Sequence, residues 1–76
     1  MKLRVGDLYS VHKNMIAQTT YRLFHSSPVN DDVVTIHKIE YYPYENSVIY
    51  YTSLATGCWD VMSIDMFIGV FEETKQ

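Results

Sequence analysis

The sequence has few of the features that mark secreted, membrane-spanning or nucleic-acid-binding proteins. It contains one cysteine, Cys58, so no internal disulfide can form, and this favours a reducing cytosol over secretion. The N-terminus lacks the apolar segment of a signal peptide. No apolar run approaches the roughly 20 residues that are needed to cross a bilayer. We therefore expect a cytoplasmic protein without membrane association.

Positive charge is also scarce. Six lysines and arginines accompany nine aspartates and glutamates, which gives a formal net charge of −3. The basic residues are spread along the chain without a cluster: Lys2, Arg4, Lys13, Arg22, Lys38 and Lys75. Because nucleic-acid binding depends on a basic surface that neutralises phosphates, this charge disfavours a nucleic-acid partner. A basic or neutral protein partner fits it better, since charge complementarity speeds encounter.

No group of residues has the spacing of a catalytic or metal site. The histidines, His12, His25 and His37, are 13 and 12 residues apart, unlike the closely spaced ligands of zinc sites. Cys58 has no Cys-x-x-Cys partner and precedes Trp59, so we interpret it as a small packed hydrophobe. The three glycines form no phosphate-binding loop. The sequence thus predicts no enzyme activity, no cofactor and no metal.

The length of 76 residues predicts one domain, residues 1–71, followed by a polar tail, residues 72–76. A chain of this size buries only about 60% of the surface that its unfolded form exposes. A partner or a second copy would add to this burial. Seven tyrosines favour strands, because tyrosine fits a pleated, half-buried surface.

The pattern of apolar residues predicts a mostly β fold. Strands are expected at residues 8–12, 20–24, 33–40, 48–54, 58–62 and 68–71. The alternation slips at Ile39, which indicates a bulge near Lys38. Residues 13–19 are expected to form a loop, and helical periodicity is sustained nowhere for three turns. Ser63 can cap a helix, but Gly69 follows so soon that a single 3₁₀ turn is predicted.

The order of these elements carries a family resemblance. Gly6, Asp7 and Tyr9 form a Gly-Asp-x-Tyr motif at the first strand, and Trp59 follows a central hairpin, before the one-turn helix and the terminal strand. This order resembles small SH3-like β-barrels, including short uncharacterised bacterial and phage proteins. The resemblance implies a small SH3-like barrel or a strongly curled antiparallel sheet of five or six short strands. It does not imply proline-rich ligands, because the acidic loop and the Ala-Leu-Tyr-Asp-Tyr pattern are absent.

Aromatic residues give the clearest indication of a binding surface. The candidate partner-binding residues are Tyr41, Tyr42, Tyr44, Tyr50, Tyr51 and Trp59. In each adjacent pair of tyrosines one side chain should face inward and the other outward, because side chains alternate along a strand. Exposed tyrosines are typical of interfaces, whereas cross-strand aromatic pairs also serve simply to stabilise a hairpin. Trp59 is either a core residue or a contact residue.

The sequence therefore favours a small non-catalytic module for protein–protein interaction. A phage-type modulator or inhibitor of a larger host protein is one form of it, and a homodimer formed through an exposed edge strand is another. The alternative is an SH3-like nucleic-acid-binding protein whose aromatic rings stack on bases, with Arg22 and Lys38 as its basic residues. A small enzyme or ligand-binding protein has the least support, since so short a chain can hardly form both a core and a pocket.

Overall fold

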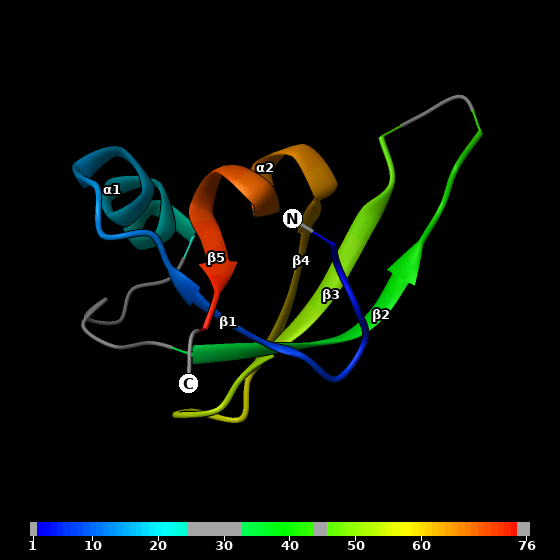
Figure 1. The fold of residues 1–76 in the computed structure, drawn as a ribbon, viewed down its shortest axis with the longest axis horizontal. Coiled ribbons are helices and arrows are strands. Elements are labelled where there is room, and N and C mark those ends of the chain that lie inside the picture. The colour runs from blue at the N-terminus through cyan, green and yellow to red at the C-terminus, as the bar shows by residue number, and fades with distance from the viewer. Residues whose placement is uncertain (1, 25–32, 44–45, 75–76) are drawn as a thin grey trace.

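The computed structural model describes residues 2–24, 33–43 and 46–74 and shows five strands and two helices within them (Figure 1). The elements are β1 (Leu8–Val11), α1 (Met15–Phe24), β2 (Val33–Glu40), β3 (Val48–Ser53), β4 (Trp59–Ser63), α2 (Ile64–Val70) and β5 (Phe71–Glu73). The strands form one sheet in the order β4-β3-β2-β1-β5, and all neighbours are antiparallel. The predicted mostly β fold is therefore confirmed.

The sheet is open and does not close into a barrel. Closure requires the two edge strands to pair, but β4 and β5 lie at opposite edges with three strands between them. An open sheet must bury its apolar face against another layer. Here the two helices supply that layer, so the expected SH3-like barrel is not what the described residues form.

Helix α1 replaces a predicted loop and a predicted strand. The sequence predicts a loop at residues 13–19 and a strand at residues 20–24, whereas one helix of ten residues spans most of both. The Asn14 side chain caps this helix by accepting a hydrogen bond of 2.8 Å from the Ala17 N–H. Ala17 and Tyr21, one helical turn apart, are buried in the core. Their burial outweighs the β propensity of the segment, so the strand prediction is wrong.

Helix α2 begins where the sequence predicted a cap. The Ser63 hydroxyl oxygen accepts a hydrogen bond of 3.2 Å from the N–H three residues later. The element is an α-helix of seven residues instead of one 3₁₀ turn, because Phe67 and Val70 are held in the core. It continues through Gly69, so the last strand begins only at Phe71. Neither helix in the described ranges is long and apolar enough to span a membrane.

The predicted bulge in β2 is confirmed. Ile36 pairs with Tyr51 and Lys38 pairs with Tyr50, so the register shifts between these positions and His37 is the extra residue. A bulge of this kind leaves the extra residue without a partner in the ladder and bends the strand. It also changes which side chains of β2 reach each face of the sheet.

The last strand extends into the predicted polar tail. Glu72 pairs with Ser10 and Glu73 with Tyr9, both on β1. The Thr74 N–H then donates a hydrogen bond of 3.1 Å to the Leu8 carbonyl. Backbone pairing with β1 therefore holds the chain in place past residue 71, where the tail was expected to begin.

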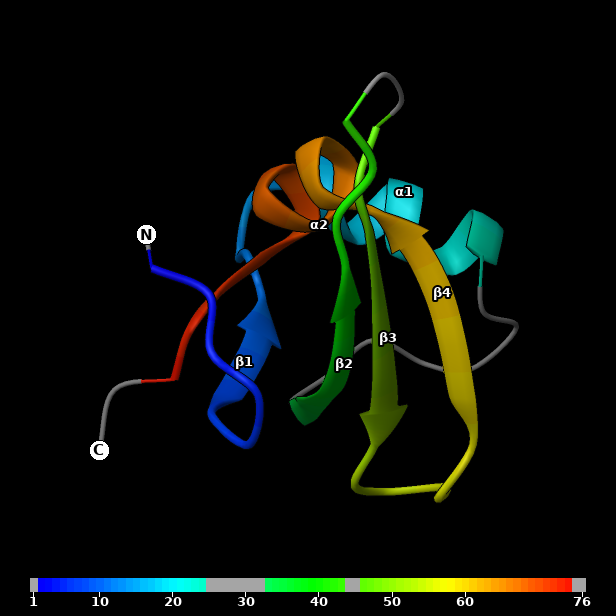
Figure 2. The ribbon, with the colours of Figure 1, turned by 90° about the vertical axis from the view of Figure 1, so that its right-hand side faces the viewer.

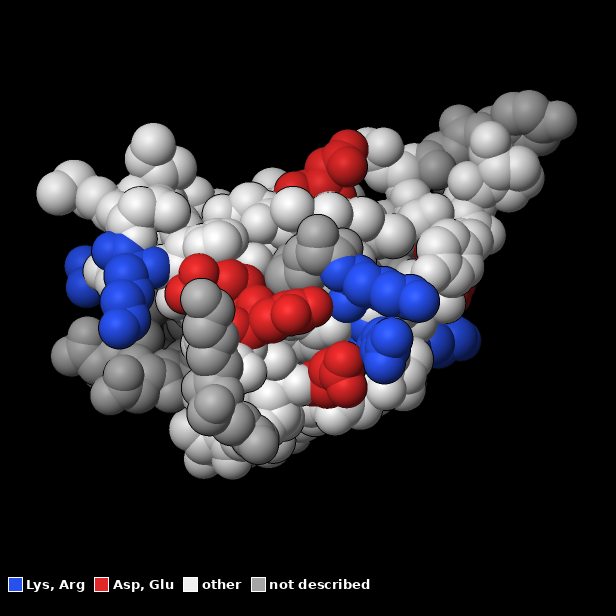
Figure 3. All heavy atoms as spheres, in the orientation of Figure 1, with Lys and Arg blue, Asp and Glu red and all other residues white. Residues whose placement is uncertain are grey.

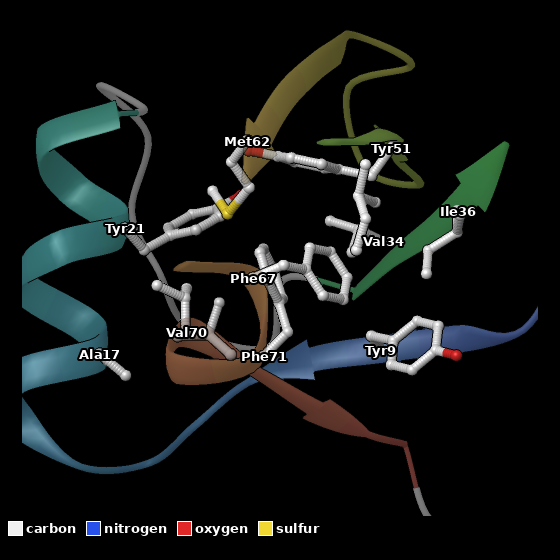
Figure 4. Packing of buried hydrophobic residues seen from close by; sticks show 12 residues of the cluster. Tyr9, Ala17, Tyr21, Val34, Ile36, Tyr51, Met62, Phe67, Val70 and Phe71 are labelled. Atoms are coloured by element: carbon white, nitrogen blue, oxygen red, sulfur yellow. The ribbon is translucent and has the colours of Figure 1, made fainter. Parts of the chain in front are cut away.

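One hydrophobic core lies between the sheet and the two helices (Figure 4). Its buried members are Tyr9, Val11, Ala17, Tyr21, Val34, Ile36, Ile49, Tyr51, Met62, Phe67, Val70 and Phe71. Phe67 is central: the centroid of its ring lies 4.5 Å from that of Phe71, 5.4 Å from that of Tyr9 and 5.8 Å from that of Tyr51. Aromatic pairs in such contact stabilise a fold beyond the area that they bury.

Replacing Phe67 by alanine should lower the free energy of unfolding by about 3–5 kcal/mol, because it leaves a cavity between three other rings. Urea denaturation at equilibrium measures this change. Ile68→Ala on the same helix is the matched control, since Ile68 is 43% exposed and its truncation should change stability by at most about 0.5 kcal/mol. Equal effects of the two substitutions would contradict the central position of Phe67.

Candidate functional site

The face of the sheet opposite the helices is uncovered along β2, β3 and β4. Figure 2 looks onto these three strands with both helices behind them. Side chains that alternate with the core positions form this surface, which we call the outer face. Its residues are Thr35, His37, Lys38 and Glu40 on β2, Val48, Tyr50 and Thr52 on β3, and Trp59, Val61 and Ser63 on β4. None of the ten is buried.

Three rings from three neighbouring strands cluster on the outer face. The ring centroids of His37 and Tyr50 are 6.0 Å apart, and Trp59 lies 6.2 Å from each of them. His37 Nδ1 is hydrogen-bonded to Thr52 Oγ1 at 3.1 Å. These contacts orient the rings, while the Trp59 side chain stays 64% exposed. The cluster is thus ordered by its own contacts and still open to a partner.

The outer face carries one charge of each sign, and the two charges are paired. Lys38 Nζ lies 3.2 Å from Glu40 Oε1 and 5.7 Å from the centre of the Tyr50 ring. The Tyr42 hydroxyl donates a hydrogen bond to Glu40 Oε2. The hydrogen bond from Tyr42, followed by those from Lys38 and Tyr50, holds the pKa of Glu40 below its ordinary value of 4.5. The same carboxylate raises the pKa of the Tyr50 hydroxyl.

Of the adjacent tyrosines in β3, one faces outward and the other inward, as predicted. Tyr50 lies on the outer face, whereas Tyr51 is buried against Phe67 and Phe71. Burial raises the pKa of the Tyr51 hydroxyl. Tyr51 is therefore part of the core and does not belong to the outer face. Trp59 is on the surface, so of its two interpretations that of a core residue is wrong.

The tyrosines before the hairpin turn do not alternate. Tyr41 is 73% exposed and Tyr42 is 39% exposed. Strand β2 ends at Glu40, so the alternation that governs a strand no longer applies to them. Tyr42 lies beside the charged pair through its hydroxyl. The predicted site residue Tyr44 falls outside the described residues.

The outer face contains two residues, His37 and Val61, that are not among the predicted partner-binding residues. His37 was interpreted as an ordinary strand-surface histidine in preference to a metal ligand, and it lies beside two aromatic rings. Alternation with the buried Ile36 held the signal for His37, whereas the bulge decides the facing of Lys38 and Glu40. Val61 lies two residues after Trp59 on β4, so alternation places both on the same face, but only the structure shows that this face is uncovered.

Strand β4 also has a free backbone edge, which is partly protected. Alternate residues of β4 make the backbone hydrogen bonds to β3, so the N–H and C=O groups of Trp59, Val61 and Ser63 point to the free edge. The Asp60 carboxylate accepts a hydrogen bond of 2.8 Å from the Val61 N–H at the middle of this edge. Such side-chain protection opposes the addition of another strand. Side chains of the outer face are therefore the better contact surface.

Other candidate features do not gather into a second site. His12 is hydrogen-bonded to Glu72 and to the Ile68 carbonyl, away from His37, and His25 lies outside the described residues. Cys58 is exposed, so its interpretation as a packed hydrophobe is wrong. Within residues 2–24, 33–43 and 46–74 no three His, Cys, Asp or Glu side chains are placed to hold a metal ion.

A hollow of about 610 Å³ lies between the N-terminal segment and the end of β5. Its lining residues are Lys2, Arg4, Gly6, Asp7, Leu8, Glu73 and Thr74. Figure 3 shows acidic and basic side chains side by side on this face of the molecule. Because both signs line the hollow, its charge selects neither an anion nor a cation. The outer face, with its ordered aromatic cluster, is the stronger candidate.

Comparison of the chain with protein-family models, with curated proteins and with solved structures gave no match.

Substituting Glu40 by glutamine should lower stability at neutral pH and have little effect at acidic pH. A carboxylate whose pKa is lower in the folded state stabilises the fold above its unfolded pKa, near 4.5, and this stabilisation is lost as the pH falls through the folded pKa. Urea denaturation of wild type and Glu40→Gln at neutral pH and near pH 3 measures it. A difference between the two proteins that stays constant across this range would contradict the assignment.

Proposed function

We propose that this protein is a small non-catalytic module that binds another protein through its outer face. The observation that carries the proposal is the exposed Trp59 ring, held within an ordered aromatic cluster on an uncovered sheet surface. As a cytoplasmic modulator or inhibitor of a larger host protein it would need only this contact surface. The modulator role and a phage origin come from the sequence resemblance to small SH3-like proteins and not from the open sheet.

The composition of the outer face supports a protein partner. An antiparallel sheet with one face on the core normally presents a polar second face to solvent. Here Tyr50, Trp59, Val48 and Val61 lie on that second face. Tryptophan and tyrosine are enriched among residues that dominate binding energy. Since their contacts already orient these rings, binding would immobilise few additional rotamers.

The charges of the outer face argue against nucleic acid as the first choice. Rings such as those of Tyr50 and Trp59 can stack on bases, but single-strand binders add a basic groove that follows the phosphates. Lys38 is the only basic residue of the outer face, and its ammonium group lies 3.2 Å from the Glu40 carboxylate. Arg22, the other basic residue of the alternative hypothesis, lies on α1. Loss of binding after nuclease treatment would favour the nucleic-acid alternative.

Trp59→Ala should reduce recovery of the partner at least tenfold in an affinity pull-down, because it removes a large, 64% exposed ring from the cluster. The pull-down is read by quantitative mass spectrometry, with nuclease treatment and at low and moderate salt. Leu23→Ala is the control, since Leu23 is a large apolar side chain on α1 that is 83% exposed but lies on the other layer.

Trp59 is the only tryptophan in the chain, so its fluorescence reports contact directly. A purified partner that binds the outer face should shift the emission of the wild-type protein. Capture that is equal for wild type and Trp59→Ala, or an emission spectrum that stays unchanged on binding, would overturn this proposal.

A further inference from the structure

The outer face is close to electrically neutral although the chain is acidic. Among its ten residues, only Lys38 and Glu40 carry full charges, and these are of opposite sign. Of the other described acids, Asp7 and Glu73 line the hollow, Asp65 is on α2 and Glu72 is on β5, whereas Asp60 lies at the β4 edge with its carboxylate on the Val61 N–H. The ten residues of the outer face therefore add no net charge that would repel a second copy of the chain.

The arrangement of charge on the outer face is also self-complementary. Lys38 and Glu40 are two residues apart on β2, so both side chains project from the same face of one strand. In a two-fold symmetric interface, each contact between two different residues occurs twice, once from each copy to the other. Opposing two outer faces thus allows Lys38 of each copy to lie near Glu40 of the other. The Lys38 side chain is 61% exposed, so its ammonium group can exchange Glu40 of its own chain for Glu40 of the other copy.

Packing two outer faces against each other would bury apolar surface that so short a chain leaves exposed. Two sheets that pack face to face interdigitate the side chains of their facing surfaces. The rings of His37, Tyr50 and Trp59 would then fill the space between the sheets, with Val61 beside them. The competing geometry, edge to edge through β4, has to displace Asp60 from the Val61 N–H.

From these observations we infer that the outer face binds a second copy of this chain, sheet against sheet, about a two-fold axis. The inference rests on the proposed function, because it uses the same surface and names the partner. In such a dimer Trp59 and Tyr50 lie at the centre of the interface, and Lys38 of each copy pairs with Glu40 of the other.

The first test is sedimentation of the full chain from low micromolar to near-millimolar concentration. The wild type should form dimers as the concentration rises. Trp59→Ala should raise the dissociation constant at least tenfold, as expected for a ring at the centre of an interface, whereas Leu23→Ala should leave it unchanged. Circular dichroism confirms that each variant is folded. A wild type that stays monomeric at the highest concentration overturns the inference.

The second test uses charge reversal to separate contact between copies from contact within one chain. Lys38→Glu gives each outer face two negative charges, and Glu40→Lys gives it two positive charges, so each variant alone should dimerise at least tenfold more weakly. Both variants lose the internal pair equally. An equimolar mixture should recover dimerisation, since the two faces are then complementary. A mixture no stronger than the separate variants overturns the inference.

A third variant identifies the edge-to-edge alternative. Asp60→Ala frees the Val61 N–H and should leave a sheet-to-sheet dimer nearly unchanged. Stronger association of Asp60→Ala, combined with no effect of Trp59→Ala, would instead assign the contact to the β4 edge and overturn the inference.

The two proposals fail separately. A monomeric wild type that still captures another protein through Trp59 contradicts only the second copy as partner. A monomeric wild type without any Trp59-dependent capture contradicts both proposals.

Discussion

The packing of Phe67 against the rings of Tyr9, Tyr51 and Phe71 is the interaction on which the rest of the structure depends. It attaches the short helix α2 to the sheet and so buries the inner face of three strands. A helix of seven residues is too short to be stable alone and gains its stability from tertiary packing. Because both helices are committed to this face, the opposite face of the sheet has no cover within the described residues.

The uncovered face acquires its character from a local irregularity in β2. His37, the extra residue of the bulge, lies on the side opposite the buried Ile36, with its ring centroid 6.2 Å from that of Trp59, and after the bulge Lys38 lies on this side as well, paired with Tyr50. Without the bulge, alternation after Ile36 would direct Lys38 and Glu40 toward the core. A single inserted position thus links the core packing on one side of the sheet to the aromatic cluster on the other.

Charge and backbone protection define how this surface can be used. The Lys38–Glu40 pair keeps the face neutral, and Asp60 blocks the middle of the β4 edge. Neutral aromatic surfaces are suited to contact with protein, whereas a phosphate backbone requires unpaired cations. The same features that weaken the nucleic-acid alternative therefore favour side-chain packing against a sheet or another apolar surface.

The sequence by itself determined the mostly β class, four of the strands, the bulge near Lys38 and the Ser63 cap, because each has a signal within a few neighbouring residues. Only the tertiary structure decided that residues 15–24 form a helix, since the burial of Ala17 and Tyr21 outweighs local β propensity. The same holds for the site: alternation showed that Tyr50 and Tyr51 oppose each other. Which of them is exposed depends on the face that the helices cover, and contacts between residues far apart in the sequence determine that face.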